Sequence, residues 1–141
     1  MDDSIVRGTT SREIVQMARE SGATRVIFAS AAPPVKYPNV YGIDMPTRQE
    51  LIAYGRSDEE ICREITADAL VYQEVSAMRR AIADVNPKLS SLEASCFDGN
   101  YITGDITREY LDKLEAARNN PKTLIEDGVS SQLNLNLARG D

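Results

Sequence analysis

The chain has 141 residues, 42% of them hydrophobic, a size and composition that suit one modest folded domain. With 16 basic and 22 acidic side chains its net charge is −6, which disfavours nucleic acid as a partner. The absence of histidine excludes a histidine-based catalytic triad within the chain, and the two distant cysteines, Cys62 and Cys96, argue against zinc. We expect both to be free thiols in a reducing cytoplasm, because no signal peptide and no apolar run of about 18 residues is present.

The first predicted feature is a loop over residues 2–10. Asp2 and Asp3 run into small, glycine- and hydroxyl-bearing residues, and a helix is predicted directly after them. Loop amides and a helix N-terminus can cradle a phosphate, while the two acids can bind sugar hydroxyls or a divalent cation. Gly8 would let the backbone approach a ligand closely. The pattern favours a phosphorylated-sugar site, and the alternative is an acidic, disordered terminus.

The next elements read as most of a βαβ unit that lacks its first strand. Thr10 and Glu13 form a predicted capping box at the start of a helix that Gly22 ends. The apolar run 26–29 is typical of a buried parallel strand. We expect that strand to have an unpaired edge, so the chain is predicted to associate or unfold partially.

The middle of the chain predicts short elements. Residues 40–43 are a candidate strand, and residues 69–72 are another. Capping boxes at Thr47 and Ser57 predict two short helices separated at Gly55. A further helix ends near Pro87, and its predicted buried stripe consists of Val75, Met78, Ile82 and Val85.

The C-terminal part changes character. Residues 97–101 predict a turn between two short extended stretches. A last amphipathic helix is marked by Tyr110, Leu111, Leu114 and Ala117, and the polar tail after it is expected to fray. Cys62 is interpreted as a buried small hydrophobe and Cys96 as more exposed, and neither receives a catalytic role.

The sequence DDSIVRGTT at 2–10 resembles the phosphoribosyl-pyrophosphate (PRPP) motif of type I phosphoribosyltransferases. That short motif alone indicates a broad superfamily. Further segments resemble amidophosphoribosyltransferases in the same order, so the resemblance covers roughly residues 2–110; they are residues 28–33, 38–46, 50–53, 67–70 and 97–103, including YGIDMP and FDGNY.

The resemblance implies an α/β fold: an incomplete type I phosphoribosyltransferase fold, with a partial parallel sheet, flanking helices and a C-terminal helical extension. Residues 1–86 would be the C-terminal part of the phosphoribosyltransferase domain, 87–118 a turn and helix extension, and 119–141 a polar tail.

The resemblance also implies site roles. Asp2 and Asp3 would contact the ribose hydroxyls and help to place one Mg²⁺ ion, and the loop after them would wrap the 5-phosphate. Arg7 either contacts that phosphate or points to solvent. The residues implied in PRPP or phosphate binding are Asp2, Asp3, Ser4, Ile5, Val6, Arg7, Gly8, Thr9 and Thr10; no catalytic residue is assigned.

The implied activity joins glutamine-derived ammonia to PRPP, giving 5-phosphoribosylamine, the first step of purine synthesis. Implied partners are PRPP and purine nucleotides, without nucleic acid or membrane, in a parent homotetramer. The glutaminase domain, the pyrophosphate loop and the flexible closing loop of the family have no counterpart here, so the chain is expected to be a C-terminal fragment that is inactive alone. Two cysteines cannot hold an iron–sulfur cluster, so the resemblance is to cluster-free members.

Two alternatives stay open. The chain could be a stand-alone PRPP- or nucleotide-binding regulatory module without catalysis. It could also be a general α/β interaction domain whose N-terminal loop is accidental.

Overall fold

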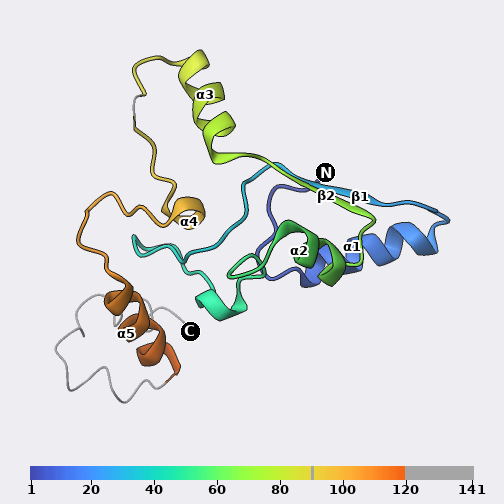
Figure 1. Cartoon of the computed structure of the whole chain (residues 1–141), viewed down its shortest axis with the longest axis horizontal. Helices are drawn as coiled ribbons and strands as arrows, with labels where there is room; N and C mark the ends of the chain where they lie inside the picture. Colours follow the sequence, from blue (N-terminus) through green and yellow to red (C-terminus); the bar gives the residue numbers. More distant parts are fainter. Residues whose placement is uncertain (90, 120–141) are drawn as a thin grey trace, which may run out of the picture. The chain divides into compact units, whose positions relative to one another are not determined.

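A computed structural model describes residues 1–89 and 91–119 (Figure 1). The chain divides into two compact units, Met1–Ile102 and Thr103–Asp141. None of the helices in the described ranges is long and apolar enough to cross a membrane. The first unit contains the sheet and the candidate site. In the second unit the described residues form α5, Arg108–Asn119, which confirms the predicted last helix. The predicted fraying of the tail concerns residues that, from 120 on, lie outside the described residues.

The sheet has two parallel strands, β1 (Ile27–Ser30) and β2 (Ala69–Tyr72). Phe28 pairs with Leu70, and Ser30 pairs with Tyr72. The connection between the strands contains α2, Asp58–Glu64, and α1, Thr9–Glu20, precedes β1 (Figure 1). A partial parallel sheet with flanking helices is the predicted fold. β2 has the predicted bounds, and β1 begins one residue later than the apolar run.

The core of the first unit lies on one face of the sheet. Side chains of alternate strand residues, including Phe28 and Leu70, point toward it because neighbours along a strand face opposite ways. The helices α1 and α2 contribute to this core, as do the loop before α1 and the segment with Ile52 and Ala53 between the strands. The buried cluster consists of Ile5, Val15, Phe28, Ile52, Ala53, Ile61 and Ile65.

The helix starts follow two different rules. At α2 the predicted capping box forms: Ser57 Oγ accepts from the Glu60 N–H at 3.3 Å, and Glu60 Oε2 accepts from the Ser57 N–H at 2.8 Å. A capping box also forms at Thr47, but the helix it begins is one 3₁₀ turn, η1, Arg48–Glu50. The box predicted at Thr10 is wrong, because α1 begins at Thr9 and its N-cap is Gly8.

Three further predictions need correction. Residues 40–43 form no strand, because the Asn39 side chain accepts from the N–H groups of Tyr41 (2.8 Å) and Ile43 (3.3 Å) and turns the chain. Residues 97–101 are not flanked by extended stretches. Residues 97 and 98 are the end of a single helical turn, α4 (Ser95–Asp98), because the N–H groups of residues 97–99 bond back to the carbonyls of Ala94 and Ser95, and Gly99 ends the turn at φ +73°.

The third correction concerns α3, Val75–Val85, whose bounds agree with the prediction but whose stripe is not buried. Val85 is 87% exposed, and Val75, Met78 and Ile82 are half-buried. An apolar stripe becomes buried only where another surface covers it, and the described part of the chain provides none over Val85.

Candidate functional site

The site begins where the N-terminus joins the sheet. The Asp2 N–H donates to the Ala29 carbonyl, and the N–H groups of Ala31 and Ala32 donate to the carbonyls of Asp2 and Asp3, each at 2.9 Å. Asp2 therefore forms a parallel bridge with Ser30. The edge of β1 that was expected to be unpaired is closed at this end. The two acids occupy the place of a neighbouring strand, at the carboxyl end of β1, where open parallel sheets bind ligands.

The two carboxylates are braced by the backbone that follows each of them. Asp2 Oδ1 accepts from the Asp3 N–H at 3.0 Å, and Asp3 Oδ1 accepts from the Ser4 N–H at 2.5 Å. In both residues Oδ2 accepts no hydrogen bond from the described residues. Two carboxylate oxygens of this kind suit Mg²⁺ as ligands, because the ion usually keeps water and substrate oxygens as its other ligands. No group of three potential metal-ligating side chains occurs among the described residues.

The loop presents an unbroken run of free amides. Every backbone N–H from Ile5 to Ser11 lacks an acceptor among the described residues, and the first helical amide bond of α1 runs from Arg12 to the Gly8 carbonyl. No side chain caps the helix. The positive end of the α1 dipole thus lies beside N–H groups that can donate hydrogen bonds to a phosphate.

Not every predicted loop side chain is available to a ligand. Ile5 is 1% exposed and packs in the core, so only its backbone can contribute. Thr9 and Thr10 are exposed at the start of α1, and Ser4 Oγ lies 3.4 Å from Asp3 Oδ1. Ile5 therefore anchors the loop in the core, while the side chains of Thr9 and Thr10 remain accessible.

Arg7 is paired with an acid from a distant segment, and a contact of its side chain with a phosphate stays a prediction. Its Nη2 donates to Glu50 Oε1 at 3.0 Å, and the two side chains are 59% and 48% exposed. The pKa of Glu50 lies below its ordinary value, chiefly because of the hydrogen bond from the Thr47 backbone, then that from the Thr47 hydroxyl, with a smaller contribution from the Arg7 charge.

Sequence reasoning missed the segment under the loop, residues 47–53, which we call the loop seat. The Ile52 N–H donates to the Val6 carbonyl at 2.8 Å, and Ile52 lies against Gly8. Leu51, Ile52 and Ala53 are all buried. The available signal was the capping box at Thr47, which places Glu50, but nothing local shows that Glu50 faces Arg7.

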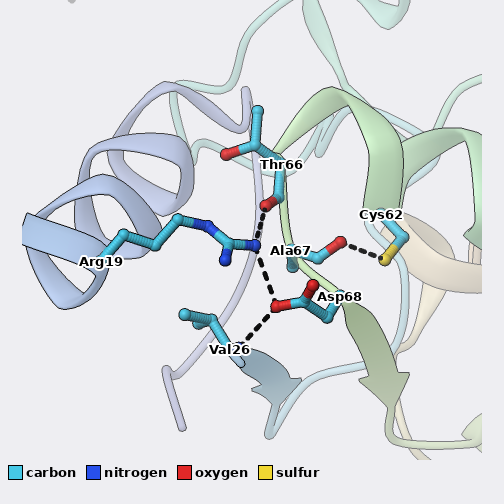
Figure 2. Close-up of polar contacts among 6 residues, drawn as sticks. All are labelled: Arg19, Val26, Cys62, Thr66, Ala67 and Asp68. Carbon is cyan, nitrogen blue, oxygen red and sulfur yellow. Dashed lines mark hydrogen bonds and ion pairs between the residues drawn. The ribbon is translucent and has the colours of Figure 1, made fainter. Parts of the chain in front are cut away.

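A second polar cluster fixes the other end of α1 (Figure 2). Asp68 Oδ2 accepts from the Val26 N–H at 2.6 Å and from Arg19 Nη2 at 2.9 Å. Arg19 Nη2 also donates to the Thr66 carbonyl at 3.0 Å. The end of α1 is thus fastened to the residues that precede both strands. This helps to hold the α1 N-terminus at the carboxyl edge of the sheet.

The thiols show no sign of activation. Burial is the main cause that raises the pKa of Cys62, with the charges of Asp68 and Glu59 adding to it. The Cys62 thiol donates to the Ala67 carbonyl at 3.2 Å (Figure 2). Burial also raises the pKa of Cys96, so both thiols are less nucleophilic than a free cysteine at neutral pH.

No family model matches the chain. It is 55% identical over 119 residues to the amidophosphoribosyltransferase of Pasteurella multocida and 54% identical over 135 residues to that of Haemophilus influenzae. These matches cover 84% and 96% of this chain but 24% and 27% of the relatives, so the chain spans about a quarter of their length.

A solved structure gives the same result. The glutamine PRPP amidotransferase from B. subtilis, complexed with ADP and GMP, aligns with a TM-score of 0.62 at 42% identity, over 79% of this chain and 26% of that one. The similarity extends through both sequence and fold and confirms the incomplete phosphoribosyltransferase architecture. The chain is therefore a homologue of one part of the amidophosphoribosyltransferases.

Proposed function

We propose that this chain forms the ribose 5-phosphate side of a PRPP site, as part of an amidophosphoribosyltransferase that makes 5-phosphoribosylamine for purine synthesis. The free amides from Ile5 to Ser11, beside two carboxylates at the carboxyl edge of the sheet, are the observation that carries this proposal. The relatives' shared name supports the choice of PRPP over other phosphates.

In this function the loop amides and the α1 N-terminus bind the 5-phosphate. Asp2 and Asp3 accept hydrogen bonds from the ribose hydroxyls, and their fixed negative charge favours the oxocarbenium character that develops at C1. Their free oxygens fit Mg²⁺, which would supply charge compensation for the departing pyrophosphate. Because the chain spans only a quarter of its relatives, we expect it to bind but not to turn over PRPP.

A regulatory module is the second candidate, because the similar solved enzyme was complexed with ADP and GMP. Tight binding of purine nucleotides by a stably folded chain would favour it. The homotetramer and the division at residues 86 and 118 stay predictions of the resemblance, and the cytoplasmic location stays a prediction from the sequence.

Calorimetric titration of the purified chain with ribose 5-phosphate and with PRPP, with and without MgCl₂, tests the proposal. The double variant Asp2→Asn/Asp3→Asn should weaken binding by about tenfold or more, because two charged acceptors are lost. Asp84→Asn is the matched control, since Asp84 is exposed on α3 and its side chain makes no hydrogen bond or ion pair with the described residues.

Equal affinity of the double variant and the wild type would reject the site and favour the interaction-domain alternative. Production of phosphoribosylamine from PRPP and glutamine by this chain would contradict the expected lack of turnover.

A further inference from the structure

The loop seat fixes the backbone of the candidate phosphate loop from below. The Ile52 N–H binds the Val6 carbonyl at 2.8 Å, and Gly8 rests on the side chains of Ile52 and Ile65. These contacts come from residues that are almost completely buried, so this part of the loop has little freedom to move. The exposed residue between these two positions, Arg7, is held by one other side chain in the part of the chain that the structure describes.

That side chain is Glu50, which uses its two oxygens for different purposes. Oε2 accepts from the Thr47 N–H at 2.9 Å and from Thr47 Oγ1 at 3.0 Å, and this fixes the carboxylate on the seat. Oε1 remains for Arg7 Nη2, at 3.0 Å. The carboxylate is ionised at neutral pH because these donors favour its charged form. Glu50 thus connects a rigid segment to the loop residue between Val6 and Gly8.

We propose that Glu50 is a positioning residue that acts through Arg7 to hold the free amides of the loop ready for a sugar phosphate. The inference rests on the proposed function of the loop. An ion pair this exposed adds little to the free energy of folding. Its contribution is instead to preorganisation, because a loop that is already ordered loses less entropy on binding. The role therefore predicts an effect on ligand affinity without a matching effect on stability.

Glu50→Gln tests the role, with Glu64→Gln as its matched control. Glu64 pairs with Arg12 in an ion pair of similar exposure, 51% and 52%, that does not involve the loop. We expect Glu50→Gln to weaken ribose 5-phosphate binding by about fivefold, the scale of one surface charge pair, and Glu64→Gln to leave it unchanged. Both variants should have the unfolding midpoint of the wild type.

A double-mutant cycle separates positioning from a general structural effect. In an Arg7→Met background Glu50→Gln should have no further effect on affinity, because its partner is already gone. An undiminished effect in that background, or equal affinities for Glu50→Gln and Glu64→Gln, would overturn the inference.

A ligand-free measurement keeps the inference testable if the proposed function fails. In NMR spectra of the unliganded chain, Glu50→Gln should shift the amide signals of Val6, Arg7 and Gly8, whereas Glu64→Gln should not. Unchanged loop amides would reject the positioning role. Absence of wild-type binding together with shifted amides would reject only the sugar-phosphate assignment.

Discussion

Gly8 is the residue at which the candidate site and the core meet. Its φ of +81° lies in the left-handed region that glycine adopts without a steric penalty. A Cβ at this position would collide with Ile52 Cδ1. Gly8 is also the N-cap of α1, and its N–H is one of the free loop amides. Gly8 therefore meets three requirements at once: a left-handed backbone conformation, close packing against Ile52 and an N–H that is free to bind a ligand.

Gly8→Ala should destabilise the chain more than Gly55→Ala. Gly55 also has a positive φ, +69°, but a Cβ there would meet nothing within 4 Å. Gly55→Ala thus costs only the left-handed strain of about 1 kcal/mol, while Gly8→Ala adds overpacking against Ile52 for a total of about 3 kcal/mol. Urea unfolding of the two variants measures the difference, and equal losses would show that Ile52 moves aside without cost.

The local chemistry of the site could be predicted from the sequence, but its supports could not. Acids, glycine and hydroxyl residues next to a helix start act through their neighbours in the chain, so residues 2–10 were found from a short pattern. Arg7 and Glu50 are separated by 43 positions, and only folding brings them together. The burial of Ile5 was missed for the same reason, because the surfaces that cover it come from distant segments.

At the scale of elements, apolar runs predicted both strands because buried parallel strands leave few positions for polar residues. What aligns them is polar. The Asp68 carboxylate accepts from the Val26 N–H (Figure 2). The Asp68 N–H donates in turn to the Val26 carbonyl at 2.9 Å, so the two segments are paired just before β1 and β2 begin. Asp68 lies in the segment that carries the family resemblance, but its partner at Val26 is visible only in the fold.

Asp68 predicts a defined acid sensitivity. The Val26 hydrogen bond, followed by that of Arg19, lowers the pKa of Asp68 below its ordinary 3.8. A carboxylate whose pKa is lower in the folded state stabilises the fold fully above the unfolded pKa, and loses that contribution as the pH falls through the folded pKa. Asp68→Asn should therefore be less stable than the wild type at pH 7, and this difference in stability should become smaller below pH about 4.

Thermal unfolding of the wild type and Asp68→Asn between pH 7 and pH 3 measures this gap. Asp84→Asn, which removes an exposed carboxylate that has no partner in the described part of the chain, gives the baseline. A gap that stays constant with pH would show that Asp68 acts through its shape and not through its charge.

At the scale of the whole molecule, the residues that the structure describes cover the sheet on one face only. Residues of the opposite face are apolar, and the two largest, Ile27 and Val71, are 57% and 55% exposed. Ala29 and Ala69 lie on the same face, since Ile27 pairs with Ala69 and Ala29 with Val71. The outer edge of β2 also has no partner strand among the described residues. The predicted tendency to associate thus has its basis in this face and this edge, more than in β1, whose edge Asp2 and Asp3 close at its carboxyl end.

Replacing the large side chains of this face should reduce association. We expect the double variant Ile27→Thr/Val71→Thr, which keeps β-branched residues in the strands, to remain monomeric at concentrations where the wild type forms oligomers. The control Ile43→Thr/Ile102→Thr removes two isoleucines that are 64% and 70% exposed but lie outside the sheet, and it should associate like the wild type.

Because copies with a net charge of −6 repel one another, wild-type association should strengthen as salt screens that repulsion. Sedimentation velocity at low and at physiological salt measures both effects, and a monomeric wild type under both conditions would show that the exposed sheet face does not drive association.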